Sequence, residues 1–106
     1  MASRLNTSNM DLNTRVKCSE GQVAADLGGE MAILNLKTGV YYGLDEVGTR
    51  IWALLQESRT VSQIRDVILQ EYAVDAARCE KDIVVLLADL AKHELIEMSH
   101  EPDRPL

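Results

Sequence analysis

Glycine-containing turns divide residues 22 to 44 into three short strand-like runs, and this feature constrains the fold more than any other. The Gly pair at 28 and 29 separates the first two runs with the spacing and chemistry of a tight hairpin. Gly39, which suits a backbone with positive φ, separates the second run from the third, 40–44. Hairpins join antiparallel neighbours, so the sequence predicts a three-stranded antiparallel meander whose last strand lies at an edge of the sheet.

From Asp45 onwards, the spacing of apolar residues changes from that of strands to that of helices. Three successive segments carry an apolar stripe, and each begins at a residue type that caps helix N-termini. These caps are Asp45, Thr60 with Gln63 as its capping-box partner, and Asp75. The third helix is the longest, and we expect Leu95 and Ile96 to close it near its C-terminus. Three strands followed by three helices form an α+β domain in which the helices cover one face of the sheet.

A chain of 106 residues, 46% of them apolar, provides one small core and no second one. The first 14 residues are rich in Asn, Ser and Thr and show no apolar period, so we expect a flexible N-terminal arm over 1–14. Both prolines follow residue 100, so we expect a flexible tail over 100–106 and a folded domain over 15–99. No apolar run approaches the roughly 18 residues of a membrane helix, which disfavours a membrane location.

The net charge is −6, from 11 basic and 17 acidic residues, and all of it lies in the helical part of the chain. Residues 1–44 hold four residues of each sign, so 45–106 carry the whole excess. Proteins bind phosphate backbones through Lys and Arg, which displace counterions. An acidic helical half therefore disfavours nucleic acid as a partner.

The residue types that carry catalysis or bind metals form no recognisable set. Cys18 and Cys79 show no CxxC pairing, which favours two reduced thiols in a cytoplasmic protein. His93 and His100 match no common metal spacing, and neither has a nucleophile nearby in the sequence. No glycine-rich phosphate loop is present. We therefore expect a binding module without cofactor or metal, and not an enzyme.

The predicted edge strand has a feature that a stable core does not require, an edge that is open to pairing. It contains Val40, Tyr41, Tyr42 and Gly43, with no Pro, Lys or internal charge to block pairing with another extended chain. Such a strand is a docking site for a peptide. The alternative is structural: the two tyrosines lie on opposite faces of the strand, so at least one of them belongs in the core.

The third helix has a second such feature. Val85 lies outside the apolar core arc, with Leu86 at its border and with Asp82 and Asp89 close to it at 100° per residue. An apolar residue flanked by two acids suits a peptide with apolar anchors and a basic residue. Alternatively, Val85 is a scattered exposed apolar residue and the acids form an ordinary solvated face.

The string Gly39-Val-Tyr-Tyr-Gly-Leu-Asp-Glu-Val-Gly48, followed by Ile-Trp and Leu-Leu at 51–52 and 54–55, resembles the PqqD-like family. Members of this family are also called RiPP recognition elements, after the ribosomally synthesised and post-translationally modified peptides that they serve. The likeness covers about residues 22–97 and is closest to the stand-alone members of lasso-peptide biosynthesis. Many members have Gly before the terminal Leu-Ile pair, where this chain has Glu94. The third helix therefore either continues for another turn or is capped differently.

The resemblance implies a winged helix-turn-helix-like domain that binds the leader segment of a precursor peptide. The leader would become a further strand beside the third strand, in the cleft against the third helix. Carried over by position, the backbone groups of Val40, Tyr41, Tyr42 and Gly43 would pair with the leader. The other wall would be formed by Asp82, Val85, Leu86 and Asp89.

The partners that the resemblance implies are the leader peptide, a leader peptidase of the cysteine-protease type and a macrolactam-forming cyclase. One alternative keeps the fold and makes the protein a PqqD-type chaperone that delivers a precursor peptide to a radical SAM enzyme. The other is a winged-helix regulator of DNA. The charge of the third helix disfavours it, because three basic residues stand against five acidic ones over 78–97.

Overall fold

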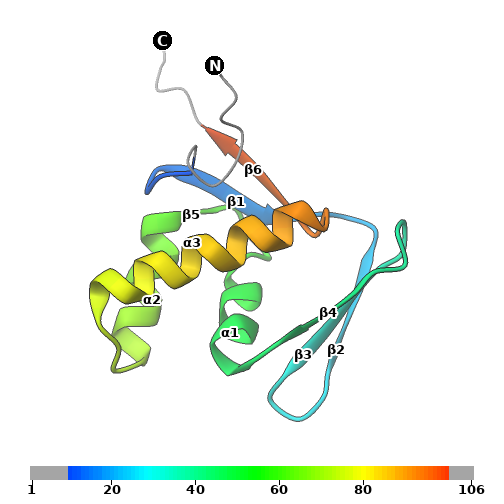
Figure 1. Cartoon of the computed structure of the whole chain (residues 1–106), viewed down its shortest axis with the longest axis horizontal. Coiled ribbons are helices and arrows are strands. Elements are labelled where there is room, and N and C mark those ends of the chain that lie inside the picture. The colour runs from blue at the N-terminus through cyan, green and yellow to red at the C-terminus, as the bar shows by residue number, and fades with distance from the viewer. Residues whose placement is uncertain (1–9, 101–106) are drawn as a thin grey trace.

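The computed structural model of the protein describes residues 10–100 and contains two small antiparallel sheets and three helices (Figure 1). One sheet has the order β2-β3-β4 and the other has the order β5-β1-β6. The elements are β1 (Thr14–Cys18), β2 (Gln22–Asp26), β3 (Met31–Asn35), β4 (Tyr41–Leu44), α1 (Glu46–Leu54), β5 (Arg59–Thr60), α2 (Val61–Glu71), α3 (Ala76–Lys92) and β6 (Ile96–His100). The predicted α+β class is confirmed.

The β2-β3-β4 sheet is the predicted meander. Its two hairpins turn at glycines in the left-handed region, with φ of 86° and 101° at Gly28 and Gly29 and of 77° at Gly39. Residues Ile33 and Tyr42 lie opposite each other in the register of β3 and β4. Within residues 10–100, β4 pairs only with β3, so it lies at an edge of the sheet as predicted.

All three predicted helix caps are present. Asp45 accepts a hydrogen bond from the Gly48 backbone N–H, and Asp75 accepts one from that of Arg78. Thr60 and Gln63 form the reciprocal capping box at the start of α2. These local motifs explain why the three helices begin where the sequence predicts them to begin.

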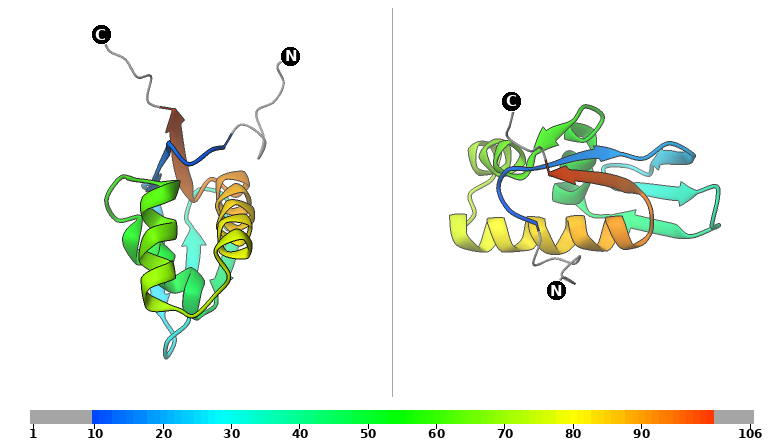
Figure 2. Two further views of the ribbon diagram at one scale, coloured as in Figure 1. Left: turned by 90° about the vertical axis from the view of Figure 1, so that its left-hand side faces the viewer. Right: turned by 90° about the horizontal axis from the view of Figure 1, so that it is seen from above.

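The β5-β1-β6 sheet was not predicted, and two of its strands lie at the expected limits of the folded domain, 15 and 99. β1 begins at Thr14, inside the expected arm, and Met10 and Leu12 pack against the core. β6 contains Ile96, which the sequence had suggested would end the third helix. β1 and β6 pair from Thr14 opposite His100 to Cys18 opposite Ile96 (Figure 2). The rest of the expected arm, 1–9, and of the expected tail, 101–106, lies outside the described residues.

The third helix ends at Lys92, earlier than predicted, because Glu94 takes the role that Gly has in many helix ends. Its φ is 61°, in the left-handed region. The Leu95 N–H donates to the Leu90 carbonyl and the Glu94 N–H donates to the Ala91 carbonyl, which is the Schellman pattern. Of the two possibilities raised by Glu94, the different cap is therefore the one observed.

We expect the substitution Glu94→Gly to stabilise the protein by about 1 kcal/mol, because Gly adopts the left-handed region without the strain of a side chain. The midpoint of thermal unfolding should rise by about 4 to 8 °C. The ion pair of Glu94 with Lys37 is exposed, so its loss should cost little. Glu94→Ala removes the same charge but keeps Cβ, and an equal gain in that variant would show that charge, and not backbone strain, is responsible.

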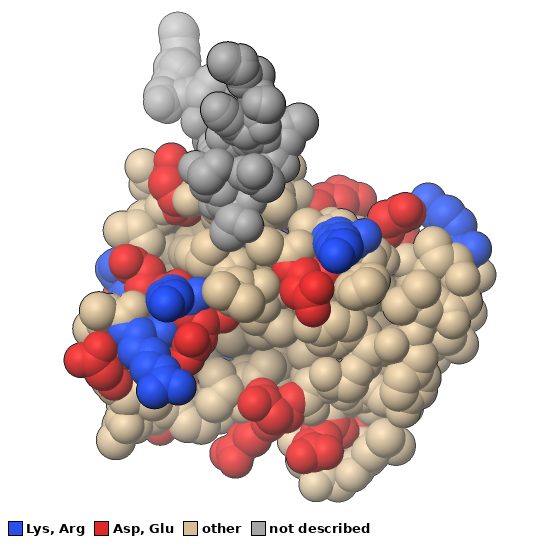
Figure 3. Space-filling model, in the orientation of Figure 1, with Lys and Arg blue, Asp and Glu red and all other residues tan. Residues whose placement is uncertain are grey.

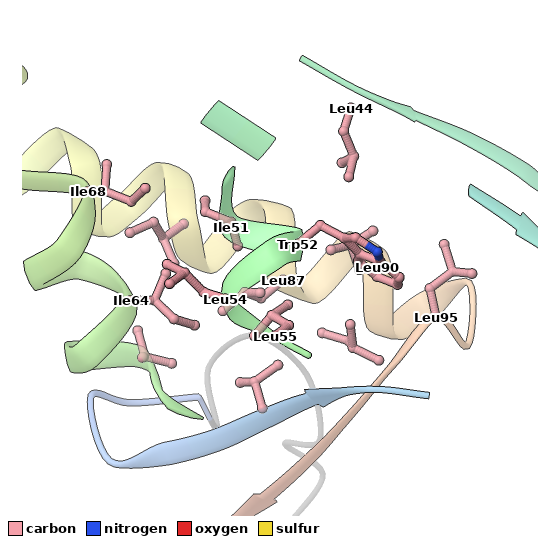
Figure 4. Close-up of a cluster of buried hydrophobic side chains, with 14 of the residues drawn as sticks. Leu44, Ile51, Trp52, Leu54, Leu55, Ile64, Ile68, Leu87, Leu90 and Leu95 are labelled. Atoms are coloured by element: carbon pink, nitrogen blue, oxygen red, sulfur yellow. The ribbon is translucent and has the colours of Figure 1, made fainter. Parts of the chain in front are cut away.

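The core lies between the three helices and both sheets (Figure 4). Trp52 and Leu55 of the first helical segment, Ile64 of α2 and Leu87 of α3 are all buried. Ile33 extends this core into the β2-β3-β4 sheet. Among residues 10–100, no helix is long and apolar enough to cross a membrane.

Candidate peptide-binding groove

A groove of about 700 Å³ lies between α3 on one side and β4 with the start of α1 on the other. Its floor is apolar, because it is formed by the buried side chains of Ile51, Ile68 and Ile83, one from each helix. In Figure 1, β4 lies below the C-terminal part of α3, and α1 lies between β4 and the rest of that helix. The groove is thus bordered by a helix face and by the edge strand of a sheet.

The groove brings together five of the eight residues that the sequence singled out. Asp82, Val85, Leu86 and Asp89 line its α3 wall, and Tyr42 lines its β4 wall. Val85 is 57% exposed although it is apolar, so it offers apolar surface that the core does not use. Residues that the sequence analysis missed also line the groove: Asp45, Val47, Val74, Asp75 and Arg78. The two helix caps among them show that cap positions can face a site as well as start a helix.

The register between β3 and β4 determines which backbone N–H and C=O groups of β4 point away from β3. The Asn35 N–H donates to the Val40 carbonyl oxygen at 2.8 Å, so residues 35 and 40 form a hydrogen-bonded pair. Hydrogen-bonded and non-bonded pairs alternate in an antiparallel ladder. Tyr42, which is opposite Ile33, therefore also faces β3 with its backbone groups.

The Val40 carbonyl oxygen and the backbone groups of Tyr42 are directed at β3, while the Val40 N–H donates to Thr38 Oγ1 at 3.2 Å. That all four residues of 40–43 pair with a peptide stays a prediction, and this register favours Tyr41 and Gly43 for the pairing. The backbone groups of Tyr41 and Gly43 point away from β3, to the edge where no other strand of residues 10–100 lies. The Tyr41 side chain is 64% exposed and lies on the opposite face of the sheet from Tyr42. An added strand would therefore bond to Tyr41 and Gly43.

A hydrogen bond joins the two walls of the groove. The Tyr42 hydroxyl donates to Asp89 Oδ2 at 2.5 Å, and the Tyr42 ring lies 5.5 Å from that of His93. Burial, together with the hydrogen bond to Asp89 and the charge of Asp89, raises the pKa of Tyr42 to about 12. Tyr42 thus stays a neutral donor at physiological pH. The sequence placed Tyr42 and Asp89 on opposite walls but gave no sign of this bond.

Asn35 fixes the same end of the groove. Its side chain is buried, with Nδ2 donating to the His93 carbonyl at 2.9 Å and Oδ1 accepting from the backbone N–H groups of Lys37 and Thr38. One side chain therefore holds the β3–β4 turn and ties it to the end of α3. The sequence gave no sign of the bond to His93, because the two residues lie 58 positions apart.

We expect Asn35→Ala to lower the free energy of unfolding by about 2 kcal/mol, because a buried side chain is truncated and part-buried backbone groups of Lys37, Thr38 and His93 lose their partner. Urea denaturation should show a lower midpoint with an unchanged slope. Asn13→Ala, at an exposed position, is the matched control. Equal stability of the two variants would contradict this role of Asn35.

The cysteines are thiols at neutral pH. Burial raises the pKa of Cys18 to about 11, and burial also raises the pKa of Cys79. The thiol is much less nucleophilic than the thiolate. In the part of the chain from 10 to 100, no three His, Cys, Asp or Glu side chains are placed to hold a metal ion.

The sequence matches the family model described as coenzyme PQQ synthesis protein D (PqqD) over residues 30–96. The chain belongs to the PqqD family. The match includes β4 and α3, the two elements that border the groove. The resemblance inferred from 39–48 and the residues that follow it is confirmed. Among curated proteins, no sequence matches this PqqD-family chain significantly.

Solved structures similar to this PqqD-family chain include TbiB1 in complex with the TbiA(beta) leader peptide. The two sequences are 44% identical, with 76% of this chain and 94% of that chain covered and a TM-score of 0.71. Lasso peptide synthetase B1 complexed with its leader peptide is 20% identical, with 77% and 96% covered and a TM-score of 0.68.

A third similar structure is the PqqD truncation of Methylobacterium extorquens PqqCD, a stand-alone RiPP recognition element. It is 24% identical, with 86% and 97% of the chains covered and a TM-score of 0.71. At these identities, the second and third structures establish the fold of the PqqD family for this chain, including the predicted winged-helix-like arrangement of a small meander with three helices.

Proposed function

We propose that this protein binds the leader segment of a ribosomally made precursor peptide and serves a lasso-peptide or related RiPP pathway. The observation that carries the proposal is the free edge at Tyr41 and Gly43 beside a groove whose far wall exposes Val85. The similarity to TbiB1, which was solved with a leader peptide, supports it.

The leader would bind by strand addition. Its backbone would pair with Tyr41 and Gly43, which gives affinity for any extended chain. Alternate side chains of a strand point to opposite faces, so every second leader side chain would enter the groove against Val85 and Leu86. These side chains would give specificity, because the apolar floor and wall accept apolar groups and exclude water from the paired strand.

In this proposal the protein is an adaptor without catalysis of its own. By holding the leader, it presents the precursor to a leader peptidase of the cysteine-protease type and to a macrolactam-forming cyclase. The reactions would become faster through effective concentration and orientation. The adaptor would act in the cytoplasm, where the thiols of Cys18 and Cys79 stay reduced.

The test is a titration of the labelled protein with a synthetic peptide that covers the leader of the precursor encoded beside its gene. Fluorescence anisotropy should show saturable binding with one peptide per chain. A peptide of the same composition in scrambled order is the control. Equal affinity for both peptides, or no binding of either, would rule out leader recognition.

The PqqD family match also favours a second candidate, a chaperone that delivers a precursor to a radical SAM enzyme. The two candidates share the groove and differ in the enzyme served. Pull-down with the bound leader against a purified peptidase, cyclase or radical SAM enzyme from the same gene neighbourhood separates them. A winged-helix regulator is disfavoured by acids on the exposed side of α3, and salt-dependent binding of duplex DNA would be required to support it.

A further inference from the structure

The α3 wall of the groove carries two carboxylates on either side of its apolar centre. Asp82 and Asp89 are seven residues apart, which is close to two helical turns, so both point to the same side of α3. Val85 and Leu86 lie between them, and all four residues line the groove. Figure 3 shows acidic side chains spread along the surface below α3, with uncharged surface between them.

Asp82 and Asp89 are the two acids of the groove that do not cap a helix. Asp45 and Asp75 also line it, but each caps a helix N-terminus, whose partial positive charge offsets its own. Asp82 lies in the middle of α3, and Asp89 lies in its last turn, where the helix C-terminus carries a partial negative charge and offsets none of its own. Arg78 is the one basic residue among those that line the groove.

Both carboxylates have acceptor capacity left for a ligand. Asp82 lies 3.5 Å from Arg78 in an ion pair whose side chains are 65% and 79% exposed, so this pair is weak and can be replaced. Asp89 uses Oδ2 to accept from Tyr42, while Oδ1 lies 3.8 Å from His93 Nε2. A cationic side chain in the groove would find an oxygen of each carboxylate.

The spacing of the carboxylates fits an extended peptide. Along the helix axis, Asp82 lies about 4.5 Å before Val85 and Asp89 about 6 Å after it. In a strand, side chains on one face are about 7 Å apart, because they belong to every second residue. A strand beside β4 that places one side chain against Val85 therefore brings the side chains two positions away close to the carboxylates, within the reach of Lys or Arg.

We propose that the groove selects segments in which a central apolar residue is flanked, two positions before and two positions after, by Lys or Arg. This inference rests on the proposed leader binding and names the class of leader that the site takes. The apolar residue packs on Val85 and Leu86, and the two cations pair with Asp82 and Asp89. The excess of negative charge in the helical half favours the approach of such a segment.

The experiment is a set of double-mutant cycles between protein and peptide. The probes are the synthetic leader peptide described above and versions in which each Lys or Arg of the paired segment is replaced by Gln. With the intact leader, Asp82→Asn and Asp89→Asn should each weaken binding by about three- to tenfold. With the Gln peptides the matching Asn variant should change nothing further. Asn at 89 still accepts from Tyr42, so the wall keeps its shape.

Two further variants sharpen the result. Glu57→Gln removes one negative charge at a side chain that is 83% exposed and outside the groove, so it should leave the affinity unchanged. Arg78→Gln frees Asp82 and should tighten binding of the intact leader about threefold, but not that of the Gln peptides. If Glu57→Gln and Asp82→Asn weakened binding equally, the effect would come from the net charge of the protein and not from a pair in the groove, and the inference would be overturned.

The outcomes separate this inference from the proposed function. If the intact leader binds but both Asn variants bind it as wild type does, or if the bound segment has no Lys or Arg at these positions, the charge selection is wrong and leader binding stands. If the intact leader does not bind at all, both are wrong.

Discussion

Tyr41→Pro is expected to weaken leader binding by about thirtyfold to a hundredfold. Proline has no N–H, so the free edge of β4 loses one of the donors with which an added strand pairs, and its ring occupies the space that this strand needs. Each lost hydrogen bond contributes about 0.5 to 1.5 kcal/mol, and the steric block adds to it. The affinity for the leader peptide, measured by anisotropy or calorimetry, reports the effect directly.

The fold should tolerate this change, because the Tyr41 N–H does not face β3 and proline is accepted on edge strands with the N–H side to solvent. Circular dichroism and the unfolding midpoint would verify that. Tyr41→Ala is the matched control, since it removes the same exposed ring but keeps the N–H. Strong loss of binding in the alanine variant would assign the role to the side chain and contradict pairing through the backbone.

Val85→Asp is expected to weaken leader binding by about thirtyfold. The new carboxylate would lie at the apolar centre of the groove, between two existing carboxylates, and a bound peptide would cover it without supplying a partner. Burial of an unpaired charge costs several kcal/mol in full, and partial access to water reduces this to about 2 kcal/mol. The same titration measures it.

Val23→Asp is a close control for this variant. Val23 is 52% exposed and Val85 is 57% exposed, so the two substitutions change the same chemistry at similar burial, one in β2 away from the groove and one within it. Neither should unfold the protein, because both positions face solvent. If the two variants bind the leader equally well, the α3 wall is not part of the binding surface.

The meander and the helix starts could be predicted because short-range chemistry determines them. A Gly pair requires a turn, and Asp45, Thr60 and Asp75 cap helices within three residues of themselves. The second sheet could not be predicted in this way, because β1 meets β6 from the far end of the chain and β5 has only two residues. The alternation of buried Thr14 and Val16 with Arg15 is too short to stand out beside a polar arm.

The residues of the α3 wall could be predicted from the sequence, but the register in which β4 pairs with β3 could not. The helical period placed Val85 outside the core arc, and the structure places it in the groove. Which backbone groups of β4 are free depends on how β3 pairs, and the sequence does not state that. The end of α3 was predicted too late because Glu does not usually adopt the left-handed backbone conformation that ends a helix here. A Gly at position 94 would have indicated this helix end.

The pairing of β1 with β6 brings the two ends of the domain side by side, with Thr14 opposite His100. Both strands lie on the side of α3 that is away from β4 (Figure 1). The ladder that joins the first and last described strands therefore lies away from the edge at Tyr41 and Gly43. Closing the described fold into one unit does not use the backbone groups that an added strand needs.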